Sequence, residues 1–132
     1  MKLLLHTDGG ARGNPGPAAI GWVLFTEEER IIDHGAEYLG ETTNNVAEYE
    51  GLLRGLAAAK RRDCDELEVY MDSELVVKQV RGDYAVKAPH LTELRERAAQ
   101  ALASFPKHSI NHVPRSHPRQ TRADQLVNET LG

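Results

Sequence analysis

The sequence predicts a mixed α/β fold, in which an antiparallel meander and parallel strands form one five-stranded sheet flanked by helices. Short apolar runs bounded by turn residues recur along the chain, as is typical of strands. The first three runs follow one another with short connections, which indicates an antiparallel meander. The later runs are separated by segments with helical spacing, and such crossover connections join parallel strands.

The first third of the chain reads as three consecutive strands. An apolar run at residues 3–5 predicts a buried strand that ends at Asp8. We expect the backbone to turn at Gly9 and Gly10, where glycine also allows another molecule to approach closely. The second strand, the hairpin tip and the third strand are predicted at residues 18–26, 27–29 and 30–39.

Helices and strands alternate through the rest of the chain. Thr43 or Asn44 can cap the first helix, and Ser73 the second. Gly82 suits the end of the second helix, and Pro89 suits the first turn of the third. The predicted elements are a helix over 42–62, a strand over 67–71, helices over 74–81 and 89–104, a strand over 109–113, and a helix over 121–131, with residues 114–120 as a loop.

Length and composition place the chain among ordinary globular proteins. Its 132 residues, 40% of them hydrophobic, predict a single domain over 1–132. No apolar run reaches the roughly 20 residues that span a bilayer, and a lone cysteine, Cys64, fits a reducing compartment, so we expect a cytoplasmic protein. The net charge of −4 argues against a nucleic-acid partner, unless clustered acids bind divalent metal and reverse the local charge.

Four acids occupy comparable places along the chain. Asp8 ends the first strand, and Asp72 follows the strand over 67–71. If these strands are parallel neighbours, which lie about 4.8 Å apart, the two carboxylates lie side by side. Glu48 lies one turn into the first helix, and Asp124 in the first turn of the last. All four are hard oxygen donors, which suit Mg²⁺ or Mn²⁺.

The contexts of these acids resemble the type 1 ribonuclease H family over nearly the whole chain. The resemblance implies the ribonuclease H-like fold and an endonuclease that hydrolyses the RNA strand of an RNA–DNA hybrid. It also implies that Asp8, Glu48, Asp72 and Asp124 hold two Mg²⁺ ions, with Mn²⁺ as a substitute. The matching motifs, in order, are Thr7-Asp8-Gly9-Gly10 with Gly13-Asn14-Pro15-Gly16-Pro17, Thr43-Asn44-Asn45-Val46-Ala47-Glu48, Asp72-Ser73, and His117-Pro118 with Arg122-Ala123-Asp124.

The resemblance also implies residues that contact the substrate. Family members place a mobile His, or in some an Arg, before the final Asp to help the product leave or to move protons. His117 matches the His-Pro pattern, whereas Arg115 follows Val-Pro as in members that use Arg, so both stay candidates. The hybrid-contacting residues implied by position are Asn14, Asn44 and Asn45 at the 2′-hydroxyls of the minor groove, Thr43 at a DNA phosphate, and the backbone at Gly9 and Gly10.

Residues 82–89 form a short connector, so we expect no basic protrusion, and we expect no hybrid-binding domain before Met1. This is the compact bacterial or archaeal-like form of the family. We also expect a monomer. Two alternatives stay open. One is a non-catalytic nucleic-acid-binding module of the same fold, although four acids beside phosphate disfavour it. The other is a nuclease acting on double-stranded RNA or on single ribonucleotides embedded in DNA, since the groove contacts are shared.

Overall fold

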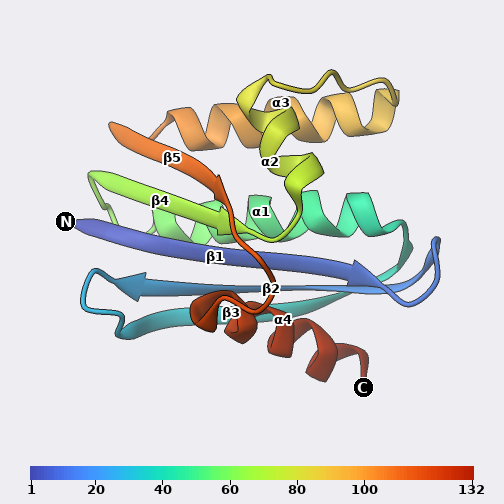
Figure 1. The fold of residues 1–132 in the computed structure, drawn as a ribbon, viewed down its shortest axis with the longest axis horizontal. Helices are drawn as coiled ribbons and strands as arrows, with labels where there is room; N and C mark the ends of the chain where they lie inside the picture. Colours follow the sequence, from blue (N-terminus) through green and yellow to red (C-terminus); the bar gives the residue numbers. More distant parts are fainter.

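A five-stranded mixed sheet organises the protein, as seen in a computed structural model that describes residues 1–132 (Figure 1). The strand order across the sheet is β3-β2-β1-β4-β5. The first three strands pair antiparallel, whereas β4 runs parallel to β1 and β5 parallel to β4, which confirms the predicted fold class. The strands are β1 (Lys2–Ala11), β2 (Gly16–Thr26), β3 (Ile31–Thr42), β4 (Glu66–Met71) and β5 (Lys107–His112).

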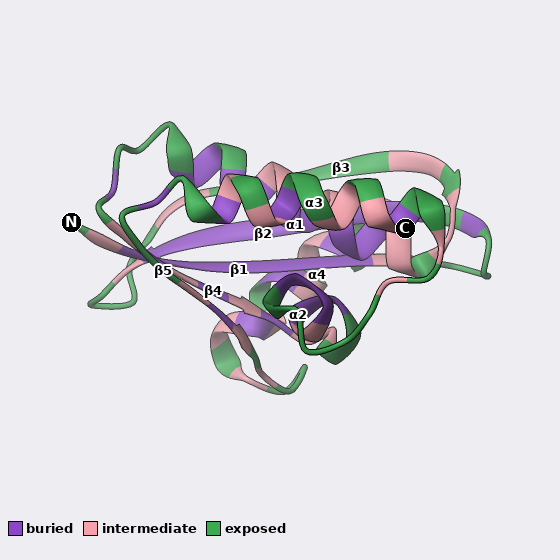
Figure 2. Ribbon diagram, turned by 90° about the horizontal axis from the view of Figure 1, so that it is seen from above, coloured by how far each residue is buried: buried purple, intermediate pink, exposed green.

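Helices cover both faces of this sheet. On one face α1 packs over β1 and β2, with α3 against its outer side, and α4 covers β1 and β2 on the opposite face (Figure 2). The larger apolar cluster lies under α1 and α3, and a smaller one under α4. None of the helices is long and apolar enough to cross a membrane. The helices are α1 (Asn44–Lys60), α2 (Glu74–Arg81), α3 (Pro89–Ala103) and α4 (Pro118–Leu131).

The predicted caps form and fix where the helices near the acids begin. The Thr43 hydroxyl accepts a hydrogen bond from the Val46 N–H at 3.3 Å, which starts α1 just before Glu48. Ser73 caps α2 in the same way, directly after Asp72. Gly82 ends α2 with a φ of 88°, a left-handed conformation that glycine adopts without strain. The chain therefore enters α2 directly after the end of β4.

Two predictions of local structure were wrong. The strand β1 does not turn at Gly9 and Gly10, because these residues stay paired with β2 as far as Ala11. The last helix begins at Pro118 rather than at residue 121, because proline fits the first helical position and the His117 ring nitrogen accepts from the Arg119 N–H at 3.2 Å. Asp124 consequently lies in the second turn of α4, not in the first.

Other boundaries differ from the prediction by a few residues. Several strands extend beyond their apolar runs, because pairing with a neighbouring strand continues through polar residues. The strand β5 begins two residues earlier than predicted and ends one residue earlier, and α1 is shorter at both ends. These shifts leave the element order unchanged.

Candidate active site

Three of the four predicted acids lie together at one end of the sheet. Asp8 on β1, Glu48 on α1 and Asp72 after β4 each offer a carboxylate oxygen, and these oxygens lie within 4.8 Å of one another. Asp8 is only 4% exposed and Glu48 only 6%. Three acids from separate elements thus form one cluster, in which Asp8 and Glu48 are buried and Asp72 is partly buried.

Parallel pairing brings the two aspartates together. The register of β1 and β4 ends at the pair Thr7↔Met71, and Asp8 and Asp72 are the next residue on each strand. The Asp8 and Asp72 carboxylates therefore lie at the same level of the sheet, as the sequence predicted for parallel neighbours. This is the carboxyl end of the parallel strands, where α/β sheets bind ligands.

A close approach of α1 to β1 brings in the third acid. A Cβ atom on Gly9 would lie 2.2 Å from the Ala47 carbonyl oxygen, and one on Gly51 would lie 2.5 Å from the Asp8 carbonyl oxygen. Only glycine permits this spacing. The Gly9 N–H then donates to Glu48 Oε1 at 3.0 Å. The group that approaches Gly9 closely is therefore the backbone of α1, whereas the sequence predicted the approach of another molecule.

Burial and mutual repulsion make this cluster unfavourable without a counter-charge. Burial, followed by the charges of Glu48 and Asp72, raises the pKa of Asp8 well above its ordinary value. Burial and the charge of Asp72 likewise raise the pKa of Glu48, although the Gly9 N–H opposes this rise. Asp72 Oδ1 is buried and has no hydrogen-bond partner. A divalent cation would satisfy the unpaired oxygen and offset the repulsion, so the residues fit a hard metal ion.

The fourth acid lies across the same pocket and is linked to the cluster through Arg115. Asp124 lines the pocket together with Asp8 and Glu48. The Arg115 guanidinium Nε lies 3.3 Å from Asp72 Oδ2 and 3.7 Å from Asp124 Oδ1. Its hydrogen bond with Asp72 and the two negative charges raise the pKa of Arg115. The Arg115 side chain is nevertheless 74% exposed, so this cation is held only by the acids.

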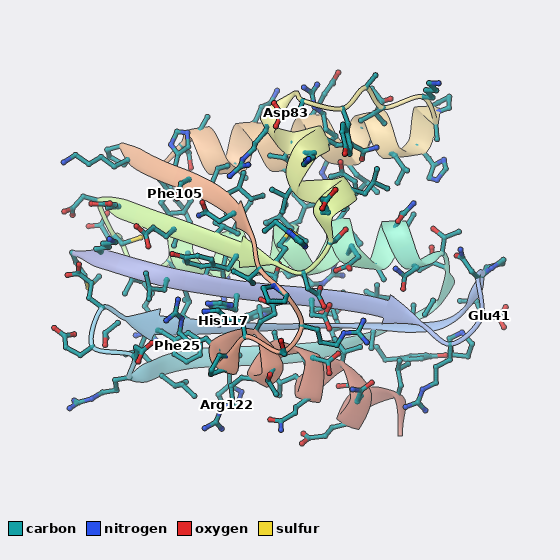
Figure 3. All side chains as sticks on the ribbon, viewed as in Figure 1. Phe25, Glu41, Asp83, Phe105, His117 and Arg122 are labelled. Carbon is teal, nitrogen blue, oxygen red and sulfur yellow. The ribbon has the colours of Figure 1, made fainter.

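His117 lies elsewhere. Its side chain caps α4, and its ring stacks on the buried His6 ring with 5.4 Å between ring centroids. Figure 3 shows His117 at the start of α4, and the His6 ring also meets the Phe25 ring edge-on. Of the two loop candidates, Arg115 contacts the acids and His117 does not.

Three of the predicted substrate-contacting residues, Gly9, Gly10 and Asn44, line the pocket that holds Asp8, Glu48 and Asp124. Asn14 Oδ1 accepts from the Asn44 N–H at 3.0 Å, and Asn44 Oδ1 accepts from the Ala11 N–H at 3.3 Å, so these side chains tie the loop after β1 to the start of α1. Asn14 and Asn44 are exposed, and Asn45 is half-buried. Gly10 and Asn44 line the same pocket as the acids. Thr43, as the cap of α1, is within one turn of this surface.

The sequence did not predict a role for one polar residue beside the site. His6 lies on β1 two positions before Asp8 and is fully buried. The available signal was a histidine directly after the apolar run over 3–5, where a strand buried on both faces should carry another apolar residue.

The strand order, the acids at the ends of two parallel neighbours and the third acid from α1 define the class of ribonuclease H-like folds. A family model described as "Reverse transcriptase-like" matches residues 6–130. A ribonuclease HI of Halobacterium salinarum is 45% identical over 130 residues, which cover 98% of this chain. The chain spans 64% of the length of that relative and 36% of three mycobacterial relatives that are 44% identical.

Solved structures agree with these sequence matches. The crystal structure of RNase H1 from the halophilic archaeon Halobacterium salinarum superposes with a TM-score of 0.94 at 43% identity, covering 99% of this chain and 98% of that one. LC11-RNase H1, solved in complex with an RNA/DNA hybrid, gives a TM-score of 0.88 at 44% identity, covering 96% and 94%. The chain belongs to the type 1 ribonuclease H family.

Proposed function

We propose that this chain is a metal-dependent endoribonuclease that hydrolyses the RNA strand of RNA–DNA hybrids. The observation that carries the proposal is the buried cluster of Asp8, Glu48 and Asp72, whose carboxylate oxygens lie within 4.8 Å of one another. A non-catalytic nucleic-acid-binding module would gain nothing from such a cluster, because unpaired carboxylates repel phosphate. The family relatives named ribonuclease HI, and the LC11 enzyme solved with a hybrid, support the same substrate.

Asp8, Glu48, Asp72 and Asp124 would hold two Mg²⁺ ions, or Mn²⁺ in their place. When bound, such ions supply Lewis acidity that activates water and stabilises the charge that develops on the leaving 3′ oxygen. Asp72 Oδ1, buried without a partner, is an oxygen ready to serve as a ligand. The Gly9 N–H orients the Glu48 carboxylate toward the cluster by donating to its Oε1 atom.

Arg115 takes the role of the mobile loop residue in this proposal. Its guanidinium already lies beside Asp72 and Asp124, and its exposure leaves it room to swing toward a cleaved phosphate. A guanidinium pairs well with phosphate oxygens, which favours departure of the product strand. His117 is instead engaged in capping α4 and in stacking on His6.

The rim around the acids would recognise the hybrid. Asn14, Asn44 and Asn45 present amides, which can donate to or accept from the 2′-hydroxyls that distinguish RNA from DNA. Gly10 leaves the β1 backbone open to the substrate, and Thr43 would approach a phosphate of the DNA strand. We further propose that residues 1–132 act as one catalytic domain, as a monomer in the cytoplasm.

Cleavage of a substrate panel tests the proposal. End-labelled RNA–DNA hybrid, duplex RNA, duplex DNA and a DNA duplex with one ribonucleotide are incubated with the protein in Mg²⁺ and in EDTA. We expect internal cuts in the RNA strand of the hybrid, in Mg²⁺ only. Binding to hybrid without any cleavage in Mg²⁺ or Mn²⁺ would contradict an enzymatic function, and preferential cleavage of duplex RNA would contradict the substrate assignment.

A further inference from the structure

A buried hydrogen-bonded chain links β1 to α4 next to the acid cluster. The ring of His6 contacts Gln120 Oε1 through Nδ1 at 2.8 Å, and Gln120 Nε2 donates to the Thr7 carbonyl oxygen at 2.8 Å. On the other side of the ring, Arg119 Nε donates to His6 Nε2 at 3.0 Å. Arg119 also pairs with Glu29 at the tip of the β2–β3 hairpin. His6 and Gln120 are both fully buried.

These contacts determine the protonation of His6. Because Arg119 can only donate, Nε2 must accept, and the ring proton is then on Nδ1, where it donates to Gln120. The ring is therefore a neutral donor and acceptor with both nitrogen atoms engaged.

The positions of His6 and Gln120 along β1 and α4 match the positions of Asp8 and Asp124. His6 and Asp8 are two residues apart on β1, so their side chains point to the same face of the sheet. Gln120 and Asp124 are four residues apart on α4, so they share one face of the helix. The pairs His6–Gln120 and Asp8–Asp124 are therefore two successive levels of contact between the same strand and the same helix. The first is a hydrogen bond, and the second sets two carboxylates across one pocket.

We propose that His6 is a positioning residue, whose hydrogen bond to Gln120 fixes α4 along β1 and thereby holds Asp124 opposite Asp8. The inference rests on the proposed function, since it concerns the same metal-binding acids. The hydrogen bond is needed because the next level is repulsive: Asp8 and Asp124 set two like charges across one pocket. The apolar cluster under α4 is small: Leu4, Val23, Phe25 and Ala123 are buried there, and Tyr70 and Leu126 pack against them.

The surroundings of His6 hold its ring in one orientation. Tyr70 from β4 stacks on it with 4.8 Å between ring centroids and 11° between ring planes. His117 lies against it as well, and Phe25 meets it edge-on at 5.6 Å. A phenylalanine at position 6 would keep these aromatic contacts while losing both hydrogen bonds, which makes His6→Phe the variant of choice.

The test separates positioning from stability. Four proteins are compared: wild type, His6→Phe, the double variant His6→Phe/Gln120→Leu, and Val23→Ala. The double variant replaces both hydrogen-bonding side chains with apolar ones, which avoids leaving a buried amide unpaired. Val23→Ala removes apolar contact under α4 without touching the hydrogen bonds, and so controls for destabilisation alone. The readouts are the Mg²⁺ concentration that gives half of the metal-induced rise in Tm, and kcat and KM on hybrid.

Both variants that lack His6 should need about tenfold more Mg²⁺ for half of the Tm rise. Their kcat should be at least about tenfold lower, with little change in KM. Groups that orient metal ligands have effects of this size. Val23→Ala should lower Tm and leave the Mg²⁺ midpoint unchanged. The proposal is overturned if the double variant has the Mg²⁺ midpoint and kcat of wild type, or if Val23→Ala shifts the midpoint as much as His6→Phe does.

The two readouts also distinguish this inference from the proposed function. If wild type does not cut hybrid but its Mg²⁺ midpoint still shifts on His6→Phe, the substrate assignment fails and the positioning role stands. If wild type cuts hybrid and neither readout responds to His6→Phe, the positioning role fails alone.

Discussion

Replacing Asp8 by asparagine should make the metal-free protein more stable while removing its activity. In the native structure the Asp8 carboxylate is buried beside Glu48 and Asp72, and its pKa is raised by burial and then by those two charges. An acid with a native pKa above its unfolded value destabilises the protein as pH rises, because the native state then holds more protons than the unfolded state. The neutral amide of Asp8→Asn escapes this cost.

The size of the effect follows from the geometry of the cluster. At the 4.8 Å limit that encloses the three oxygens, two charges repel by about 3 kcal/mol for an effective dielectric constant of about 20. Proton uptake by the cluster relieves part of this repulsion. We therefore expect Asp8→Asn to raise the free energy of unfolding of the metal-free protein by about 1–3 kcal/mol at pH 7, which is no more than the pairwise repulsion. The corresponding rise in Tm is at least about 3 °C for a domain of this size.

Thermal unfolding in EDTA between pH 4 and pH 8 measures this gain. The difference between Asp8→Asn and wild type should be largest at the highest pH and should close as the pH falls toward 3.8, the ordinary pKa of an aspartate. Adding Mg²⁺ should raise the Tm of wild type more than that of the variant. Asp33→Asn is the matched control, because Asp33 is paired with Arg62 at 3.4 Å and its loss should bring no gain. An Asp8→Asn protein that is less stable than wild type at pH 8 in EDTA would refute the reasoning.

Three further predictions concern other parts of the site. Arg115→Ala should lower turnover on hybrid severalfold with little change in KM, whereas His117→Ala should affect Tm more than turnover; the reverse result would assign the loop role to His117. Gly9→Ala should destabilise the protein by about 1–3 kcal/mol through overpacking, because the new Cβ would lie 2.2 Å from the Ala47 carbonyl oxygen. Gly10→Ala should have little effect, because the nearest atoms to its Cβ are 3.7 Å away. Equal losses of stability in chemical denaturation would contradict this prediction. The protein has a net charge of −4 and should neutralise few phosphates. In Ca²⁺, the logarithm of its binding constant for hybrid should therefore fall with the logarithm of salt concentration along a slope shallower than about −4. A steep slope that persists in EDTA would reveal a basic surface.

The mixture of antiparallel and parallel strands was predictable from the sequence, and so was the meeting of Asp8 with Asp72 once their strands are neighbours, because both depend on local patterns and on one topological rule. Apolar runs separated by helices must pair in parallel through crossovers, and an acid at the end of each of two such strands reaches the same edge. The structure confirms this pairing through the register of Thr7 with Met71.

The paths of β1 and α4 were not predictable in the same way. Asp-Gly-Gly has the composition of a turn, and only the pairing of Gly9 and Gly10 with β2 keeps it extended. Pro118 was assigned to a loop, although a capping side chain at His117 makes it the first residue of a helix. Capping by a histidine ring depends on its orientation, which a single sequence does not encode.

The contacts around the acids also depend on the assembled fold. Arg115 is 43 residues from Asp72 and 9 residues from Asp124 in the sequence, yet it contacts both. No local pattern favours it over His117. His6 and Gln120 are 114 positions apart, so their hydrogen bond exists only once α4 lies on β1. Pairings of this kind arise from tertiary packing, not from the propensity of either residue.

Cleavage of a labelled RNA–DNA hybrid by wild type and by Asp72→Asn tests the central claim most directly. We predict that wild type with Mg²⁺ cuts the RNA strand internally and leaves 3′-hydroxyl ends, because water displaces the 3′ oxygen. Asp72→Asn, which removes the charge of a ligand while keeping its shape, should retain the fold and Tm of the metal-free protein or exceed them, yet leave the RNA intact. An Asp72→Asn protein that cuts the hybrid at the wild-type rate would contradict the assignment of the acid cluster as the catalytic centre.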